Sequence, residues 1–224
     1  MTNPSQRRSF TMTRSLAFWI APITLGLVAS TIACGSTGEH GRPRESLSIG
    51  DKAPDWGSLP ATDGQSYRMA DLDSKLLAVV FACHHCPTVV AYEDRIIQLQ
   101  ADYEDKDVQV VVLNPNGIYP LSRMEDRAEE KAYNFLYIMD ESKESGHRFG
   151  ARNTPHVFLL DEDRVVRYKG SIDDNTNPAA VQQHYVRAAL DALLAGNDPP
   201  VTETNPMGCT VKYGCVEDYR ARFQ

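Results

Sequence analysis

Two cysteines separated by two residues, Cys83 and Cys86, are the residues of this chain best suited to chemistry. They follow the apolar run 76–82 and open a stretch with helical periodicity, which predicts that they lie where a buried strand passes into a helix. The free N–H groups and partial positive charge of a first helical turn lower the pKa of a thiol placed there. We therefore predict a redox-active dithiol in which Cys83 is the exposed nucleophile and Cys86 resolves the mixed disulfide.

Two histidines, His84 and His85, separate the cysteines. A protonated imidazole adds positive charge, which favours the thiolate and makes the disulfide more oxidising. We expect this tuning role mainly for His85, beside the second cysteine; the alternative is that both histidines are exposed spacers. No glycine-rich phosphate loop follows a strand, so no organic cofactor is expected besides the Cys83/Cys86 disulfide itself.

The strands that must position the pair can be predicted from apolar runs. Residues 76–82 and 108–113 have the continuous apolar character of buried strands, and 136–139 predicts a short one. Residues 157–160 and 165–168 read as a hairpin. These runs predict a sheet with the dithiol at the end of a central strand.

Helical stretches alternate with these strands. After Pro87, apolar residues recur at steps of three and four and mark one helical face, namely Val89, Tyr92, Ile96, Leu99 and Tyr103. Further helices are expected over 122–132, 141–149 and 179–194. The alternation of strands and helices indicates an α/β fold.

The order of these motifs resembles the thioredoxin superfamily, in which a dithiol after a strand is followed by Thr154-Pro155, a hairpin and a last helix. The opening segment 49–55, Ile-Gly-Asp-Lys-Ala-Pro-Asp, is similar to the peroxiredoxin-like (AhpC/TSA, redoxin) and thiol-disulfide reductase branch. The resemblance implies a central mixed β-sheet flanked by helices. It also implies that Pro155 is cis beside the dithiol and that the backbone of Thr154 pairs with an extended substrate peptide.

A peroxiredoxin-like thiol peroxidase with an antioxidant role is the alternative within this branch. Peroxiredoxins carry a Pro-x-x-x-Thr-x-x-Cys pattern, but the matching positions hold Leu76 and Val80 before Cys83, and Val79 and Cys83 before Cys86. The hydroxyl that would orient a peroxide is therefore expected to be absent.

The proton acceptor of the superfamily is also replaced. Thioredoxins keep a buried Asp six residues before the first cysteine, where this chain has Leu77. Glu93 is a second candidate acceptor, but its place in a helix makes a solvated surface charge the expected role.

A copper- or zinc-binding protein is the alternative of another class, since thiolate and imidazole are good ligands for both metals. His147 and His156 could add ligands to the cysteine pair, although each is expected to be a surface or half-buried histidine. The spacing of the pair differs from that of copper-delivery proteins with this fold, so we predict no metal site.

The C-terminal tail, residues 197–224, carries the last two cysteines, Cys209 and Cys215. A disulfide between them would staple the tail. In the alternative, Cys209 exchanges with the Cys83/Cys86 pair and acts as a relay.

The N-terminus has the features of a targeting signal. Residues 1–33 combine early arginines with an apolar run that is shorter and more broken than a comfortable membrane span, which predicts an export signal. Cys34 resembles the lipidated cysteine of a bacterial lipoprotein, but Thr31 stands where Leu is usual, so lipidation and ordinary cleavage both stay open. Two consecutive arginines also resemble a twin-arginine signal. Residues 34–46 are polar and predict a flexible tether.

Length and composition predict a single folded domain. The 224 residues, 42% of them hydrophobic, can bury one core, which we place at 47–196. Removing residues 1–33, with three arginines and no acid, takes the formal charge from −7 to −10, which disfavours binding to nucleic acid.

The resulting hypothesis is a thiol-disulfide oxidoreductase exported to the bacterial periplasm or cell envelope, with or without a lipid anchor. Its expected partners are proteins with thiols or disulfides and a membrane electron-transfer protein.

Overall fold

The computed structural model describes residues 45–116 and 118–213. The predicted export signal, Cys34, most of the predicted tether and Cys215 lie outside the described residues. Within the described part, no helix has the length and apolar character needed to cross a membrane.

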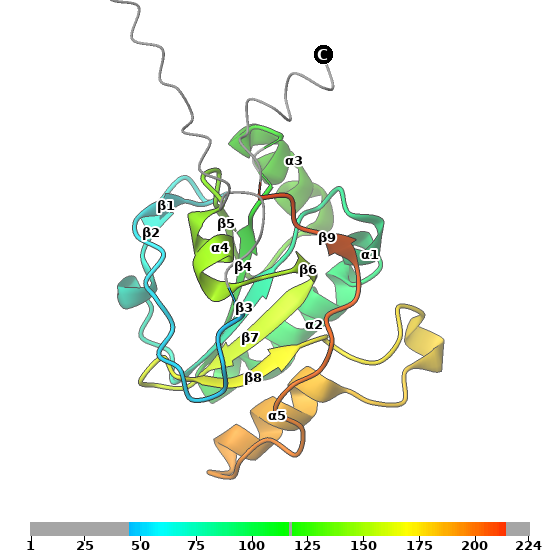
Figure 1. The fold of residues 1–224 in the computed structure, drawn as a ribbon. Helices are drawn as coiled ribbons and strands as arrows, with labels where there is room; N and C mark the ends of the chain where they lie inside the picture. The colour runs from blue at the N-terminus through cyan, green and yellow to red at the C-terminus, as the bar shows by residue number, and fades with distance from the viewer. Residues whose placement is uncertain (1–44, 117, 214–224) are drawn as a thin grey trace, which may run out of the picture. The chain divides into compact units, whose positions relative to one another are not determined.

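A five-stranded mixed sheet forms the centre of the fold (Figure 1). Its order is β5-β4-β3-β7-β8; β5, β4 and β3 are parallel, β7 runs antiparallel to β3, and β8 runs antiparallel to β7. All five were predicted, with small shifts at their ends: β3 is Leu76–Phe81, β4 Val108–Asn114, β5 Leu136–Met139, β7 His156–Leu160 and β8 Val166–Gly170.

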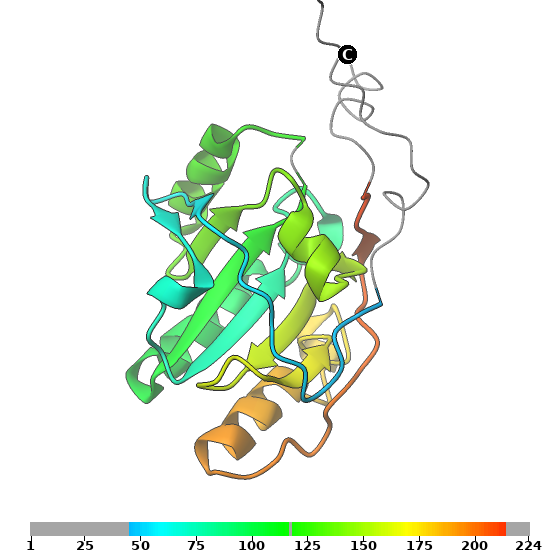
Figure 2. The same cartoon turned by 60° about the vertical axis from the view of Figure 1, so that its left-hand side comes forward.

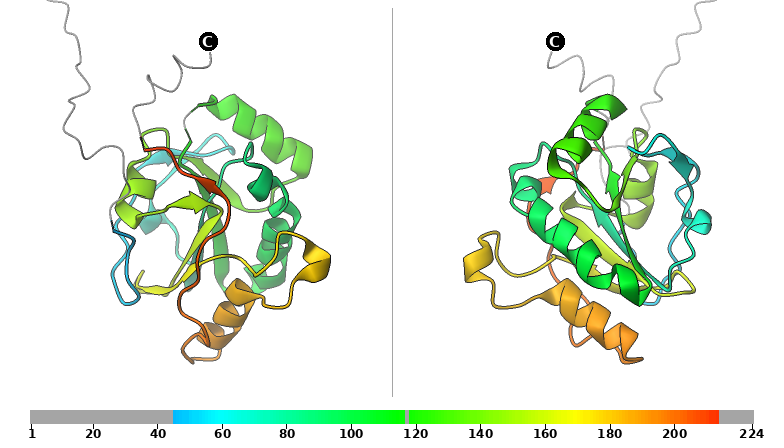
Figure 3. Two further views of the ribbon diagram at one scale, coloured as in Figure 1. Left: turned by 45° about the vertical axis from the view of Figure 1, so that its right-hand side comes forward. Right: turned by 180° about the vertical axis from the view of Figure 1, so that it is seen from behind.

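Both faces of the sheet are covered, which explains the continuous apolar runs. Ala78 and Val80 face a core shared with α2 (Glu93–Tyr103), α3 and α5 (Tyr185–Leu194). Leu77 and Val79 face a core shared with the N-terminal segment and α4. Helix α3 spans Leu121–Lys131 and α4 spans Glu144–Phe149; the N-terminal segment holds β1, Leu59–Pro60, and β2, Ser66–Tyr67. Figure 2 and the two views of Figure 3 show these layers from three sides.

The predicted helix after the dithiol is split into α1, Pro87–Val90, and α2, Glu93–Tyr103. The predicted apolar face is confirmed, because all five of its residues are buried. At the break, the N–H of Tyr92 donates to the Val89 carbonyl oxygen at 2.8 Å, which is a tighter turn than the α-helix. The Arg95 guanidinium donates to the freed Ala91 carbonyl oxygen at 3.0 Å.

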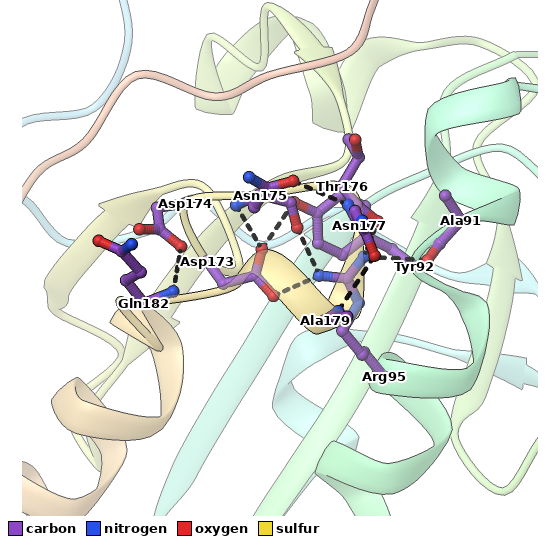
Figure 4. A network of polar contacts seen from close by, with 10 residues as sticks. All are labelled: Ala91, Tyr92, Arg95, Asp173, Asp174, Asn175, Thr176, Asn177, Ala179 and Gln182. Carbon is purple, nitrogen blue, oxygen red and sulfur yellow. Dashed lines mark hydrogen bonds and ion pairs between the residues drawn. The ribbon is translucent and has the colours of Figure 1, made fainter.

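The last helix, α5, runs from Tyr185 to Leu194, so the prediction that it starts at residue 179 is wrong. Residues 178–180 form a separate 3-10 helix, Pro178–Ala180, whose N-cap Asn177 accepts from the Ala179 N–H at 3.1 Å (Figure 4). Asp174 accepts from the Gln182 N–H at 2.9 Å, a local bond that competes with a continuous helix.

A buried carboxylate fastens the same loop to α2. Asp173 accepts hydrogen bonds from the Tyr92 hydroxyl at 2.7 Å and from the Arg95 guanidinium, which also lies over the Tyr92 ring (Figure 4). The loop is thereby held next to the helix that follows the cysteine pair.

The described part of the tail is hydrogen-bonded to the domain. Thr202 and Thr204 exchange backbone hydrogen bonds of 3.0 Å with Lys169 on β8. Further on, β9, Cys209–Thr210, pairs antiparallel with β6, Asn153–Thr154, as Figure 1 and the left view of Figure 3 show. Beyond β9, the Lys143 ammonium donates to the Lys212 carbonyl oxygen at 2.7 Å.

Candidate functional site

The cysteine pair lies at the carboxyl end of the central strand β3. Cys83 follows the strand, and Cys86 is the N-cap of α1, with Pro87 in the first helical position. Both cysteines are free thiols and both side chains are only 2% exposed. The prediction that Cys83 is the exposed member is therefore wrong.

The cause of this burial is a cover formed by three remote segments. The pair opens into a cavity of about 290 Å³, whose walls come from the loop after β4, from Thr154 and from tail residues 209–212. None of these segments is near the cysteines in sequence. The pair is thus reached through the cavity rather than from an open surface.

The pKa values of the two thiols are shifted in opposite directions. A hydrogen bond from the Cys83 thiol lowers the pKa of Cys86 to about 3, and the N–H of Val89 in α1 acts in the same direction. The same bond raises the pKa of Cys83, and burial raises it further. The hydrogen bonding of the reduced pair thus favours a thiolate on Cys86, whereas the sequence-based hypothesis gave the attacking role to Cys83.

Thr154 contacts all three cysteines of the described residues. Its hydroxyl lies 3.5 Å from the Cys209 carbonyl oxygen, to which it donates, and 3.6 Å from the Cys83 sulfur. Because a hydroxyl has one proton, a bond to Cys209 leaves the oxygen to accept from the Cys83 thiol, in keeping with a protonated Cys83. One contact acts the other way: the Cys86 sulfur lies 3.4 Å from the Thr154 carbonyl oxygen, which only a protonated Cys86 can satisfy.

The expected cis peptide bond is present between Thr154 and Pro155. The structure also brings a hydroxyl to the cysteines that the sequence pattern had not revealed. The peroxiredoxin threonine is indeed missing from β3, but the Thr154 hydroxyl reaches Cys83 from across the sheet. The predicted absence concerns only the threonine position before the cysteines; Thr154 was predicted beside the dithiol, but the contact of its hydroxyl with Cys83 was not.

Asn116 is a site residue that the sequence reasoning missed. Its amide nitrogen lies 3.8 Å from the Cys83 sulfur and 3.0 Å from Nε2 of His85, so it bridges the two side chains. It belongs to the turn that ends β4. Since β3 and β4 are parallel neighbours, their carboxyl ends meet at one edge of the sheet, and this signal could have identified the residue.

Neither histidine supplies the positive charge that we expected. Burial lowers the pKa of His84 to about 4, and burial likewise lowers the pKa of His85. His84 Nδ1 lies 3.1 Å from the Tyr137 hydroxyl, and His85 packs against the ring of Tyr119. Both imidazoles are half-buried and contact neighbours, so they are not exposed spacers either.

Glu93 is not a solvated charge, which corrects our expectation. It is 1% exposed, and its carboxylate accepts hydrogen bonds from Arg127 at 2.6 Å and from the Tyr133 hydroxyl at 2.6 Å. These partners occupy the carboxylate in a buried ion pair. Leu77, at the position of the thioredoxin Asp, is fully buried in the core.

The described residues contain no group of three or more His, Cys, Asp or Glu side chains that could hold a metal ion. His156 is 3% exposed, so it is more buried than expected, and its Nδ1 accepts the N–H of Arg152 at 3.3 Å. His147 packs against the ring of Tyr213. Neither histidine joins the cysteine pair in a metal site.

A mixed five-stranded sheet, a cysteine pair after its central strand and a cis proline beside that pair define a thioredoxin-like protein. The chain belongs to the Redoxin family, which matches residues 48–185. The comparison with curated proteins gave no match.

Two solved structures with the same fold match this chain over almost their whole length. A hypothetical protein, SMc02350, from Sinorhizobium meliloti 1021 is 31% identical, with 76% of this chain and 97% of that chain covered and a TM-score of 0.70. An uncharacterized conserved protein from Geobacillus kaustophilus is 31% identical, with 76% and 94% covered and a TM-score of 0.71.

A third similar structure has a description that names a reaction. It is a Chlorobium tepidum protein provisionally described as thiol:disulfide interchange protein DsbE, 25% identical, with 55% of this chain and 85% of that chain covered and a TM-score of 0.51. Membership of the Redoxin family and these neighbours indicate a redox enzyme in general.

Proposed function

We propose that this protein is a thiol-disulfide oxidoreductase that exchanges disulfides with partner proteins through Cys83 and Cys86. The observation that carries the proposal is the placement of two free thiols, Cys83 and Cys86, on the wall of one cavity beside the cis Thr154-Pro155 bond. The thiol:disulfide interchange named for the Chlorobium tepidum neighbour supports the same reaction class.

The exchange is balanced as two thiol-disulfide steps. The Cys86 thiolate attacks one sulfur of a partner disulfide; a mixed disulfide forms, and the other partner sulfur leaves as a thiolate. Cys83 then gives up its proton and attacks the Cys86 sulfur, which releases the second partner sulfur and closes the Cys83–Cys86 disulfide. Two electrons pass to the partner, and the reverse sequence donates a disulfide.

His85 acts in this scheme as a positioning residue. Its Nε2 accepts from the Asn116 amide, which orients that amide toward the Cys83 sulfur. With its pKa lowered by burial, His85 is neutral at pH 7 and keeps the lone pair that this bond needs. Thr154 and Pro155 shape the wall against which a partner peptide docks.

The cellular setting belongs to the same proposal. We propose export by residues 1–33 to the periplasm or cell envelope, partners that carry thiols or disulfides, and a membrane protein that supplies or removes electrons. Outside the cytosol, dithiols serve as redox catalysts or form structural disulfides. The basic residues and the apolar run at the start of the chain support the proposed export.

A thiol peroxidase is a second candidate, favoured by the Thr154 hydroxyl 3.6 Å from the Cys83 sulfur. In that reaction Cys83 first gives up its proton to the Cys86 thiolate; its sulfur then attacks a peroxide oxygen, the O–O bond breaks, and a sulfenic acid and an alcohol or water form. Cys86 then attacks the oxidised sulfur, which releases water and closes the same disulfide.

One set of variants tests both reactions. The full chain, Cys83→Ser and Cys86→Ser are compared in the reduction of insulin disulfides by dithiothreitol and in the consumption of hydrogen peroxide. We expect catalysis of insulin reduction that both substitutions abolish. Wild-type rates in either variant would overturn the exchange scheme, and peroxide turnover without insulin reduction would favour the peroxidase.

A further inference from the structure

The tail of this chain occupies the strand position where a substrate peptide is expected. β9 pairs antiparallel with β6, and the register sets Cys209 opposite Thr154, the residue before the cis proline. The Asn153 amide donates to the Gly208 carbonyl oxygen at 2.9 Å, which adds a side-chain bond to the strand pairing. The docked segment is thus held in an extended form against the site.

Two further contacts fix this segment at both ends. The N–H of Val211 donates to the Arg152 carbonyl oxygen at 2.9 Å, directly after β9. At the other end, Gly208 has a φ of +137°, and a Cβ at this position would collide with the Thr154 carbonyl oxygen. Only glycine lets the chain approach Thr154 this closely.

The docked strand delivers a third thiol to the dithiol. Cys209 lines the same cavity as Cys83 and Cys86, and its strand partner Thr154 contacts both sulfurs of the pair. It is an exposed free cysteine, so outside reagents also reach it. Because the Redoxin family matches only residues 48–185, this thiol lies outside the matched part of the chain.

We propose that Cys209 is a third redox cysteine of this site, presented to Cys86 as an internal substrate by the docking of β9 on Thr154. The proposal rests on the dithiol exchange described above. The Cys209 thiol gives up its proton and attacks the Cys86 sulfur of the Cys83–Cys86 disulfide; the Cys86–Cys209 bond forms and Cys83 leaves as a thiolate. The step is an isomerisation without net electron transfer, since the two-electron oxidation enters earlier from a partner disulfide.

The consequence is a competition at Thr154. A partner peptide and β9 need the same backbone edge, so a partner must displace the tail or receive its disulfide from Cys209. Docking replaces a freely tethered thiol with a positioned one and thereby raises its effective concentration.

Disulfide mapping of the full chain tests the proposal. Reduced wild type and Cys83→Ser are oxidised with glutathione disulfide, quenched with N-ethylmaleimide and digested for mass spectrometry. Cys83→Ser is expected to trap a Cys86–Cys209 disulfide as its main linked product. A glutathione adduct that persists on Cys86, or a Cys209–Cys215 disulfide in its place, would overturn the proposal.

A glycine pair supplies the matched control. Gly208→Ala in the Cys83→Ser chain is expected to slow the Cys86–Cys209 linkage about tenfold, because the added methyl group pushes β9 off Thr154. Gly196→Ala also has a positive φ but has no atom within 4 Å of its new methyl group, so the linkage rate should stay unchanged. Equal rates in the two variants would contradict the docking. Thermal melts verify that each variant is folded, and the Cys83→Ser result stands without them.

The outcomes for the proposal and for the exchange function are separable. One outcome is that wild type forms the Cys83–Cys86 disulfide and reduces insulin, but Cys83→Ser forms no Cys86–Cys209 disulfide. This outcome would refute the role of Cys209 and leave the exchange function intact. Wild type that forms no Cys83–Cys86 bond and reduces no insulin removes the exchange function itself.

Discussion

Removing the Cys83 thiol should raise the pKa of Cys86, because Cys83 donates the hydrogen bond that most stabilises the Cys86 thiolate. A hydrogen bond to a charged group contributes about 1.5–3 kcal/mol, and 1.36 kcal/mol corresponds to one pKa unit. Cys83→Ala is therefore expected to raise the pKa of Cys86 by roughly one to two units. From about 3 in the wild type, the pKa stays below neutral, and Cys86 remains a thiolate at pH 7.

The rate of alkylation of Cys86 should therefore rise in Cys83→Ala, although its thiol has become a weaker acid. Thiolate nucleophilicity rises with pKa with a Brønsted coefficient of about 0.4–0.5, so Cys86 in Cys83→Ala should react about three- to tenfold faster with iodoacetamide at pH 7. The assay follows the Cys86 peptide by mass spectrometry from pH 3 to 9. Cys83→Ser keeps a hydroxyl donor and should lie between the two. A Cys86 midpoint that does not move in Cys83→Ala, or a slower reaction at pH 7, would refute this account of the thiol pair.

Two further predictions concern the scaffold. Burial lowers the pKa of His156 to about 3 from an ordinary value of 6.5, so its contribution to stability is complete above pH 6.5 and is lost as the pH falls toward 3. Between pH 7 and pH 5, the free energy of unfolding measured with urea should fall by about 2 kcal/mol less in His156→Gln than in wild type. An equal fall in the two proteins would contradict the lowered pKa of His156. Arg127→Met leaves the buried Glu93 carboxylate without its main partner and should cost about 3–5 kcal/mol in stability. Arg123 is 67% exposed and pairs with the exposed Asp126, so Arg123→Met should cost under about 1 kcal/mol. Similar losses in the two arginine variants would show that the buried pair is not the stronger one.

Much of the fold could be predicted because its signals are local. The run at β3 is apolar on both faces of the sheet, and the alternating steps of three and four after Pro87 mark the buried face of the following helices. The start of α5 could not be placed, because residues 178–180 form a separate 3-10 helix and Asp174 accepts the Gln182 N–H that a propensity argument assigns to the long helix.

The candidate site was predictable only in part. The pair Cys83/Cys86 and the cis Thr154-Pro155 bond follow from motif order, whereas burial of the pair depends on segments remote in sequence. Asn116 was missed, although it follows β4, the parallel neighbour of β3, and so lies at the same edge of the sheet. Cys209 was named as a candidate relay, but its position opposite Thr154 depends on the pairing of β9 with β6, which no spacing within the chain encodes.

The most direct measurement is a redox titration of the full chain in glutathione buffers, with acid quenching, alkylation and assignment of each disulfide by mass. The account predicts a reversible Cys83–Cys86 disulfide with a midpoint between roughly −120 and −270 mV, where values near the first belong to disulfide donors and values near the second to reductases. Cys83 and Cys86 that remain thiols at every glutathione ratio would contradict the central claim.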